Sequence, residues 1–278
     1  MRLRVSPPAS PLAIAHRGAS AHAPEHTLAA YDFALGAGAD CIEQDLQMTR
    51  DGVIIVLHDD TLDRTTRGAG CRGRVIDRSL AEIRDCDAGS WFNERMPGRA
   101  RATFAEERIP PLDVVFERYA GRANFYIETK NPEEAPGMEE ALLRLLDAHG
   151  LRPPGPDPPS LLAPEALPRV IVQSFSERSL RLIRALAPEL PLVQLVRSRT
   201  GSGTIRRRLG TIAGYAQAIG PARGSVDAAL VDEAHRSGLA VHPYTVNEEV
   251  EMRRLIGLGV DGLFTDDPGV LVRVRERR

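Results

Sequence analysis

The chain of 278 residues is long enough for one α/β barrel, which takes about 250 residues, or for two smaller domains. Its hydrophobic content of 42% and charged content of 27% are ordinary for a globular enzyme, and a formal net charge of −2 excludes the basic excess of a general nucleic-acid or membrane-surface binder. No run approaches the roughly 18 apolar residues of a membrane span, and prolines interrupt the short apolar stretch near the N-terminus. Neither stable membrane insertion nor a signal peptide is therefore expected.

The three cysteines, Cys41, Cys71 and Cys86, are odd in number and lack the close spacing of metal ligands. This pattern argues against a disulfide scaffold and against structural zinc. Reduced thiols and a cytoplasmic location are expected.

The first part of the chain alternates strand-like and helical patterns. A strand is expected at 12–16, an amphipathic helix at 25–38, and two further strands at 41–48 and 53–59. Asp51-Gly52 between the last two predicts a hairpin turn.

Residues 60–110 break this rhythm, because they are rich in Arg, Gly and short polar clusters with one helical piece at 79–89. They are expected to form an insertion that flanks the main body. Alternation resumes afterwards, with strands at 124–130, 169–175, 190–196, 215–221, 239–246 and 260–266. The helices expected in this part are 111–121, 136–150, 176–188, 225–238, 247–259 and 268–277. The Pro-rich stretch 151–168 and the Gly/Arg-rich stretch 197–211 are expected to be loops.

When the hairpin at 41–59 counts as one barrel element, the chain has eight βα repeats. Repeats of this kind predict a parallel sheet with right-handed crossovers. At this length they predict α/β architecture of the TIM (β/α)8 barrel type, as a single domain over residues 1–278 with its insertion at about 60–110. A doubly wound open sheet is the alternative.

Unusual polar residues fall near the carboxyl ends of the first expected strands, where a TIM barrel keeps its catalytic groups. His16 and Arg17 end the first strand, and His58 ends the strand that returns from the hairpin. Glu43 and Asp45 lie two positions apart and share one face of the second strand. Each of these residues also has an explanation without catalysis. A histidine at a strand end often only makes a structural hydrogen bond, and a Glu-x-Asp pair often lies on a strand face exposed to solvent.

The strand at 124–130 carries a second pair on one face, Glu128 and Lys130, and Lys130 is the only lysine among 36 Lys and Arg residues. Inward-facing carboxylates without partners would cost several kcal/mol, so a cation is expected beside them. Three carboxylates suit one divalent cation, Mg²⁺ or Ca²⁺, and two histidines suit general acid and base catalysis. With Arg17 and Lys130 available for an anion, the set indicates metal-assisted phosphoryl chemistry. Asp59 and Asp60 are expected to serve a turn.

Residues 14–66, IAHRGASAHAPEHTLAAYDFALGAGADCIEQDLQMTRDGVIIVLHDDTLDRTT, closely resemble the opening of the glycerophosphodiester phosphodiesterase family. The resemblance continues at YIETK, VQSF, HPYTVN and GVDGLFTDDP, so it spans nearly the whole chain outside two loops. It implies a TIM barrel with a small insertion after the HD motif. It also implies divalent-cation-dependent hydrolysis of a small-molecule glycerophosphodiester to sn-glycerol 3-phosphate and an alcohol.

The resemblance also assigns roles to individual residues. It implies that His16 and His58 are the acid/base pair and that Arg17 and Lys130 hold the phosphate. The metal ligands that it implies are Glu43, Asp45 and Glu128. It further implies that the glycerol hydroxyl of the substrate is the nucleophile and that a cyclic phosphate is formed and then opened by water.

Two positions depart from the family pattern. His26 stands where the family commonly has Asn in PENT, and it is expected to be a substitution at a helix start, with substrate contact as the alternative. Tyr244 stands where the family usually has Trp before TVN, so it keeps an aromatic wall for the substrate with a hydroxyl and less area.

Several alternatives stay open at this point. A relative acting on bulkier diesters, as a lysophospholipase D or a sphingomyelinase D, is the rival enzyme, and a barrel that binds phosphorylated ligands without turnover is the rival outside catalysis. The sequence does not decide the head-group alcohol, the physiological metal, or whether the chain is a monomer or a homodimer.

Overall fold

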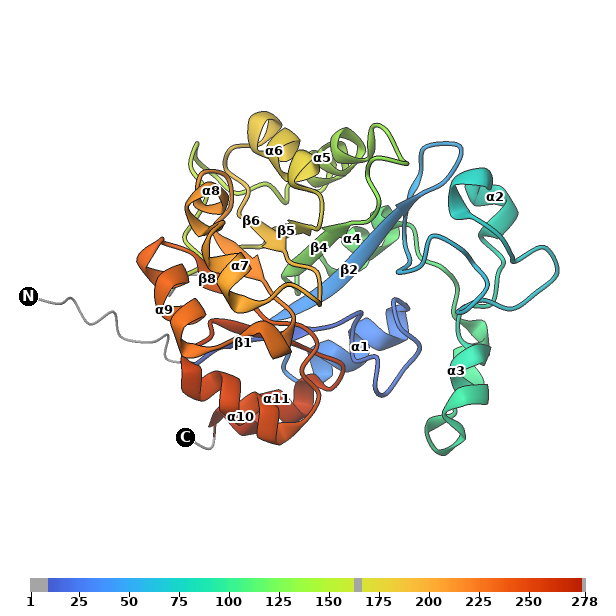
Figure 1. Cartoon of the computed structure of the whole chain (residues 1–278). Coiled ribbons are helices and arrows are strands. Elements are labelled where there is room, and N and C mark those ends of the chain that lie inside the picture. Colours follow the sequence, from blue (N-terminus) through green and yellow to red (C-terminus); the bar gives the residue numbers. More distant parts are fainter. Residues whose placement is uncertain (1–9, 163–166, 277–278) are drawn as a thin grey trace, which may run out of the picture.

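The computed structural model of the chain describes residues 10–162 and 167–276, and it confirms the TIM barrel (Figure 1). Eight strands form one parallel path in the order β8-β7-β6-β5-β4-β2-β1-β9. They are β1 (Leu12–Ala15), β2 (Cys41–Met48), β4 (Phe125–Thr129), β5 (Val170–Ser174), β6 (Leu192–Leu195), β7 (Ala218–Gly220), β8 (Ala240–Val241) and β9 (Gly262–Thr265). The backbone N–H of Asp261 donates to the carbonyl of Val241 over 3.0 Å, and that of Phe264 donates to Pro243 over 3.1 Å. These bonds join the two ends of the path, so the open doubly wound sheet is excluded.

The predicted hairpin is present beside the barrel. β3 (Ile54–Val56) pairs antiparallel with the end of β2, and Leu46 faces Val56. The turn closes where the N–H of Thr49 donates to the carbonyl of Val53, and Gly52 takes the left-handed backbone that this turn requires, with φ of +79°.

Helices cover the outside of the barrel and connect its strands. They are α1 (Leu28–Gly36), α4 (Leu112–Tyr119), α5 (Met138–Ala148), α6 (Glu177–Leu186), α7 (Ser202–Arg206), α8 (Leu209–Ala213), α9 (Ala228–Arg236), α10 (Glu249–Leu258) and α11 (Pro268–Glu276). The prediction of a loop at 197–211 was wrong, because α7 and α8 lie largely within it. Ile205, Leu209 and Ile212 recur at helical spacing in that segment and are buried, and this apolar face outweighs the Gly and Arg content.

The strand at 239–246 is also shorter than predicted. Only Ala240–Val241 form β8, and Pro243, which lacks a backbone N–H, follows two positions after it. In the rest of that segment Tyr244 forms only an isolated parallel bridge with Ala222.

The insertion lies to one side of the barrel, between β3 and α4 (Figure 1). Its short elements are η1 (Val75–Asp77), α2 (Leu80–Ile83), α3 (Ser90–Arg95), η2 (Pro97–Arg99) and η3 (Ala102–Glu106). The predicted helical piece at 79–89 therefore begins as α2, where Ser79 and Glu82 form a capping box. A small core of its own, which includes Leu62, Val75 and Ile83, packs against Ile55 of β3 and fixes the insertion to the barrel.

A disulfide joins Cys71 to Cys86 inside this small core, while Cys41 is a buried free thiol in β2. The expectation of reduced thiols was therefore wrong for this pair. The two cysteines are 15 residues apart in sequence and meet only because the insertion folds back on itself. Because disulfides persist mainly in oxidising compartments, the thiol argument for a cytoplasmic location no longer stands.

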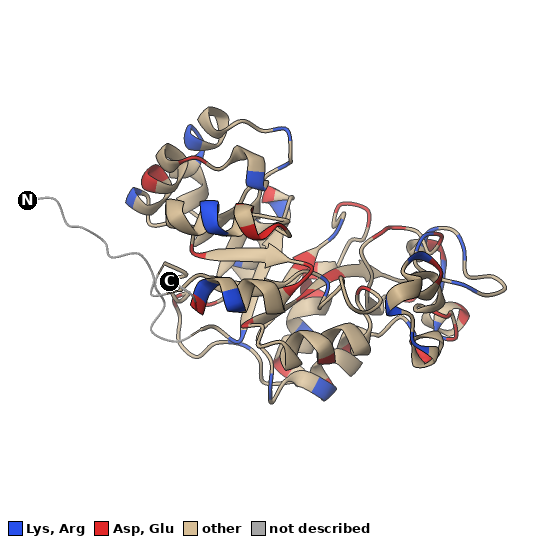
Figure 2. Ribbon diagram, turned by 90° about the horizontal axis from the view of Figure 1, so that it is seen from below, with Lys and Arg blue, Asp and Glu red and all other residues tan. Residues whose placement is uncertain are grey.

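Within the described residues, no helix has the length and apolar character needed to cross a membrane. Positively and negatively charged residues are intermingled along the outer helices and the insertion (Figure 2).

Candidate active site

The side chains that fill the barrel change from apolar to polar along β1, β2 and β4. Ile14, Cys41 and Tyr126 belong to the buried cluster inside the barrel, and strand alternation places the residues two positions later on the same face. Those later residues are His16, Glu43 and Glu128, followed by Asp45 and Lys130. The same alternation that closes the core thus turns the predicted polar groups toward the carboxyl end of the barrel.

A cavity of about 220 Å³ opens there and collects every side chain that the sequence assigned to the site. Its lining consists of His16, Arg17, Glu43, Asp45, His58, Glu128, Lys130, Gln173, Phe175, Leu195, Tyr244, Thr245 and Phe264. Gln173, Phe175, Leu195 and Phe264 were not singled out from the sequence. Strand alternation could have identified Gln173 and Phe175 as lining residues, because they follow the inward-facing Ile171 by two and four positions.

Three carboxylates lie almost fully buried in this cavity. Glu43 accepts a hydrogen bond from the backbone N–H of Arg17 over 2.7 Å and one from Gln173 Nε2 over 3.3 Å. Burial, reinforced by the charges of Asp45 and Glu128, raises the pKa of Glu43 well above its usual range. Burial and the charge of Asp45 likewise raise the pKa of Glu128 to about 8. Such carboxyls favour an additional cation, which would let all three ionise together.

Lys130 forms ion pairs with two of these carboxylates. Its Nζ lies 3.0 Å from Glu128 Oε1 and 3.7 Å from Asp45 Oδ1. Burial alone would raise the pKa of Asp45, but Lys130, His26 and Arg17 hold it well below its usual range. The lone lysine of the chain is therefore a component of the cavity and not a surface residue.

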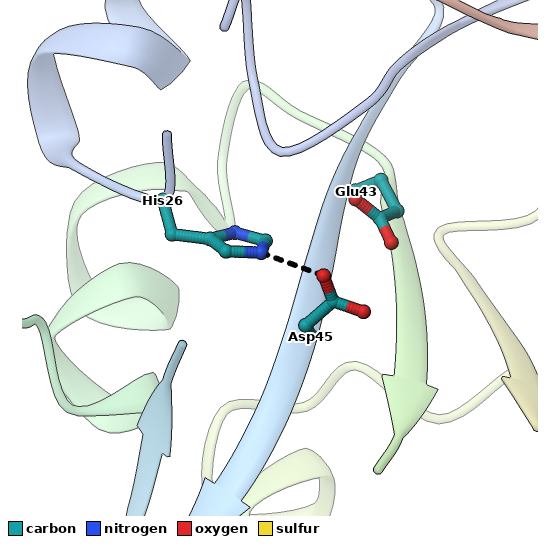
Figure 3. Close-up of side chains that lie close together, drawn as sticks. All are labelled: His26, Glu43 and Asp45. Carbon is teal, nitrogen blue, oxygen red and sulfur yellow. Dashed lines mark hydrogen bonds and ion pairs between the residues drawn. The ribbon is translucent and has the colours of Figure 1, made fainter. Parts of the chain in front are cut away.

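The His26 side chain points from the segment before α1 toward Asp45, which lies beside Glu43 (Figure 3). Its side chain is 2% exposed, its Nε2 lies 2.9 Å from Asp45 Oδ2, and its Nδ1 lies 3.1 Å from the Tyr31 hydroxyl. Thr27 is the N-cap of α1, so the prediction that His26 is only a helix-start substitution was wrong. His26, Glu43 and Asp45 each offer one potential ligand atom, and these atoms lie within 4.8 Å of one another, the one such group found among residues 10–162 and 167–276.

Each of the two predicted catalytic histidines is held at Nδ1 by a carboxylate. His16 Nδ1 lies 2.6 Å from Asp266 Oδ1, and Asp266 accepts further hydrogen bonds from Ser20 and Asn247. Although burial opposes it, these contacts lower the pKa of Asp266 to about 2, so its carboxylate stays ionised. His58 Nδ1 lies 2.6 Å from Asp59 Oδ1 in the same way. In both histidines Nε2 is left for the cavity.

A chain of charged groups connects His58 with Arg17. Arg64 donates to both oxygens of Asp59 over 2.7 and 2.9 Å, and to both oxygens of Glu25 over 2.9 and 2.7 Å. Glu25 in turn accepts a hydrogen bond from Arg17 Nη1 over 3.0 Å. The prediction that Asp59 serves a turn was wrong: it orients a histidine and is itself fixed by an arginine of the insertion.

Aromatic side chains form the opposite wall of the cavity. The Tyr244 hydroxyl donates to the carbonyl of Val196 over 2.6 Å, which fixes the ring, and the Phe175 ring meets it edge to face at 6.0 Å. Tyr244 thus takes the predicted place as a wall residue.

A second cavity of about 350 Å³ adjoins the first and shares His16 and Arg17 with it. Trp91, Phe92 and Arg95 of α3 form its outer side. His16 and Arg17 therefore stand between the first cavity and a cavity bounded by the insertion.

The residues of the first cavity fit a divalent cation on the evidence of their own contacts. Asp45 Oδ1 is buried and accepts no hydrogen bond, and Arg17 Nε is buried and donates none. Each atom has an ion-pair neighbour, Lys130 Nζ at 3.7 Å from Asp45 Oδ1 and Asp45 Oδ2 at 3.5 Å from Arg17 Nε, but neither makes a hydrogen bond. A buried carboxylate oxygen and a buried guanidinium N–H without hydrogen bonds suit a cation and an anion respectively, and oxygen donors favour a hard divalent ion. Paired cations, an oxygen-rich ligand set and two oriented imidazoles together can bind and cleave a phosphate ester.

Comparison with known proteins agrees with this chemistry. The family model described as "Glycerophosphoryl diester phosphodiesterase family" matches residues 16–270. A glycerophosphodiester phosphodiesterase of Bacillus subtilis (strain 168) is 43% identical over 95% of this chain and 86% of its own. Another from Caldanaerobacter subterraneus subsp. tengcongensis is 35% identical over 95% of this chain and 97% of its own.

Solved structures of phosphodiesterases are also similar to this chain in fold and sequence. A putative glycerophosphoryl diester phosphodiesterase from Silicibacter pomeroyi has a TM-score of 0.80 at 30% identity, covering 96% of this chain and 94% of its own. An Oleispira antarctica phosphodiesterase, described in complex with the product sn-glycerol-3-phosphate, has a TM-score of 0.77 at 27% identity, covering 96% and 97%.

Proposed function

The chain belongs to the glycerophosphoryl diester phosphodiesterase family, and we propose that it hydrolyses glycerophosphodiesters to sn-glycerol 3-phosphate and an alcohol with the help of a divalent cation. One observation carries the proposal. Two imidazoles, each held at Nδ1 by a carboxylate, face one cavity with three buried carboxylates and the cations Arg17 and Lys130.

In the first step of the proposed reaction, His58 Nε2 accepts the proton of the glycerol 2-hydroxyl. The freed oxygen attacks phosphorus, the bond from phosphorus to the departing alcohol breaks, and His16 donates a proton to that alcohol oxygen. The product is a cyclic glycerol phosphate. His16 is assigned the acid because it alone of the two histidines borders the second cavity, which has room for the departing alcohol.

The second step reverses the two roles. His16 accepts a proton from water, the hydroxide adds to phosphorus, and the bond from phosphorus to the glycerol 2-oxygen breaks. That oxygen takes the proton that His58 holds, which leaves sn-glycerol 3-phosphate and both histidines in their starting states. No serine or cysteine nucleophile is required.

The cationic groups have separate proposed tasks. Arg17 and Lys130 hold the phosphate, with Arg17 fixed by Glu25 and Lys130 by Glu128. Glu43, Asp45 and Glu128 would hold the divalent ion, Mg²⁺ or Ca²⁺. When bound, it supplies positive charge against the charge that develops on the phosphate oxygens.

The barrel and its insertion are proposed to act as one unit of the chain. The barrel supplies the carboxylates and Tyr244 as the wall for the glycerol, whereas the insertion supplies Arg64 and the outer side of the alcohol cavity. The aromatic residues Trp91 and Phe92 are 8% and 2% exposed, so they offer little apolar surface for an acyl chain. Hydrolysis of lysophospholipids is correspondingly less favoured.

A substrate panel tests the proposal. Glycerophosphocholine, glycerophosphoethanolamine, glycerophosphoglycerol and a lysophospholipid are each incubated with Mg²⁺, Ca²⁺ or Mn²⁺. Release of sn-glycerol 3-phosphate from the first three is measured by a coupled dehydrogenase assay, and hydrolysis of the lysophospholipid is measured by the release of its head-group alcohol, because its other product is a lysophosphatidic acid. We expect release from the three water-soluble diesters and little from the lysophospholipid. Turnover of the lysophospholipid alone would favour the rival enzyme, and no turnover with any metal would favour a barrel that only binds.

A further inference from the structure

We infer that His26 is a positioning residue for the candidate metal ligand Asp45: it donates a hydrogen bond to one carboxylate oxygen and so leaves the other free to face the cation. The inference rests on the proposed metal-dependent function and adds to it a residue outside the ligand and catalytic sets assigned above.

The backbone at His26 indicates that this placement has a cost. His26 has φ of +60°, and only two other non-glycine residues in the described parts of the chain, Arg17 and Asn131, have positive φ. All three lie at the mouth of the barrel, with Asn131 directly after Lys130. A histidine in the left-handed region is destabilised relative to ordinary backbone. Strain of this kind persists where surrounding contacts hold the residue in place, and here those contacts run to Asp45 and Tyr31.

The two contacts of the ring decide which nitrogen carries the proton. Asp45 Oδ2 can only accept a hydrogen bond, so the nitrogen 2.9 Å away from it, Nε2, must be the donor. In the neutral ring Nδ1 is then an acceptor, and the Tyr31 hydroxyl can donate to it over 3.1 Å. The reverse arrangement would set an unprotonated Nε2 against a carboxylate. An Nε2 that carries a proton and donates it to Asp45 does not coordinate a metal, so His26 orients a ligand and is not one.

The two oxygens of Asp45 consequently have different surroundings. Oδ2 accepts the bond from His26 and lies 3.5 Å from Arg17 Nε, whereas Oδ1 accepts no hydrogen bond and lies 3.7 Å from Lys130 Nζ. The carboxylate therefore cannot rotate without breaking a buried hydrogen bond. Groups that orient a metal ligand in this way typically contribute about 10-fold to 100-fold to metal affinity.

Two amide substitutions separate the two contacts of the ring. The amide nitrogen of His26→Gln is as many bonds from Cβ as Nε2 and can still donate to Asp45. The side chain of His26→Asn is one bond shorter, so it reaches only the Nδ1 position, although Asn tolerates a left-handed backbone better than most residues. Tyr31→Phe removes the donor to Nδ1 and leaves His26 intact. The control is His149→Gln, since His149 also pairs with a carboxylate, Asp113 at 2.7 Å, but lines neither cavity.

The experiment measures the Kd for Mn²⁺ without substrate, by titration calorimetry of the full chain, after thermal melts in chelator have shown that each variant folds. We expect His26→Asn to weaken Mn²⁺ binding by about 10-fold to 100-fold, Tyr31→Phe to weaken it in the same direction, and His26→Gln and the control to stay within a few-fold of the unmodified protein. Electron spin echo spectra of bound Mn²⁺ should show no ¹⁴N coupling from an imidazole.

Three results would overturn the inference. An unchanged Kd in His26→Asn or in Tyr31→Phe removes the positioning role, and a ¹⁴N coupling that disappears in His26→Gln makes His26 a direct ligand. If His26→Gln weakens Mn²⁺ binding as much as His26→Asn does, the weaker binding is due to loss of the imidazole ring and not to loss of the hydrogen bond to Asp45. If the unmodified protein binds no Mn²⁺, Mg²⁺ or Ca²⁺, the proposed function itself fails, which is a different outcome from these three.

Discussion

Lys130→Met tests whether the only lysine of the chain is part of the catalytic cavity. The substitution keeps most of the length and apolar stem of the side chain and removes its charge. In the folded protein that charge lies 3.0 Å from Glu128 Oε1 and 3.7 Å from Asp45 Oδ1, and the side chain is 13% exposed.

The size of the effect follows from what remains after the charge is lost. Removing one partner of a buried ion pair costs about 3–5 kcal/mol of the free energy of unfolding. Two features reduce that cost here: Asp45 keeps His26 at 2.9 Å and Arg17 at 3.5 Å, and Glu128, with its pKa raised to about 8, can stay neutral at pH 7. We therefore expect a loss of about 2–3 kcal/mol in chelator, and a smaller loss when a divalent ion replaces the missing charge.

The effect on catalysis should be larger than the effect on stability. Removal of a group that stabilises transition-state charge typically lowers kcat by about 10²-fold to 10³-fold. Urea unfolding in chelator measures the loss of stability, and kcat/KM for glycerophosphocholine with saturating Mg²⁺ measures the loss of activity.

Lys130→Arg is the matched variant, because it keeps the charge and changes its shape. It should stay close to the unmodified protein in stability yet lose a large part of its activity, since a planar guanidinium would compete for the carboxylates that hold the metal. If Lys130→Met unfolds at the same urea concentration and retains its kcat/KM, Lys130 has no role in the cavity and the reasoning is refuted.

Three further predictions follow from named contacts. His16→Ala and His58→Ala should each lower kcat/KM by at least about 10²-fold, and near-normal rates in either would remove that histidine from the acid/base pair. Arg64→Met removes the hydrogen bonds that hold Asp59 and Glu25, so kcat should fall by about 10-fold or more while the melting temperature in chelator changes little. A change in stability without a change in kcat would show that Arg64 only holds the insertion in place. The hydrogen bond to Asp261 raises the pKa of His235 despite burial, so this pair stabilises the fold fully below the unfolded pKa of about 6.5 and loses its contribution as pH rises through the folded value. Denaturant titrations should accordingly show a larger loss for His235→Gln at about pH 5.5 than at about pH 9, and an equal loss at both would contradict that sign.

The barrel and most of the cavity could be predicted from the sequence because strand alternation is a local property. Once Ile14 and Tyr126 are taken as inward-facing, His16 and Glu128 must face the same way, whatever the rest of the chain does. The hairpin could also be predicted from the sequence, because Asp51-Gly52 determines its turn.

The residues that support the site could not be predicted in this way, since their partners come from distant parts of the chain. Asp266 meets His16 across 250 positions, and the disulfide of the insertion joins two cysteines that lie 15 residues apart in sequence. His26 was judged by its place before a helix, whereas its left-handed backbone turns the side chain away from that helix start and toward Asp45. Local propensity does not contain this information.

The dependence of hydrolysis on a divalent cation is the central claim, and one measurement tests it most directly. ³¹P NMR follows glycerophosphocholine during incubation with the protein in excess chelator, and again after Mg²⁺ or Ca²⁺ is restored. We predict no reaction in chelator, because Glu43, Asp45 and Glu128 lack their counter-charge, and formation of sn-glycerol 3-phosphate once the metal returns. An undiminished rate in excess chelator, or phosphocholine in place of sn-glycerol 3-phosphate as the product, would contradict the account.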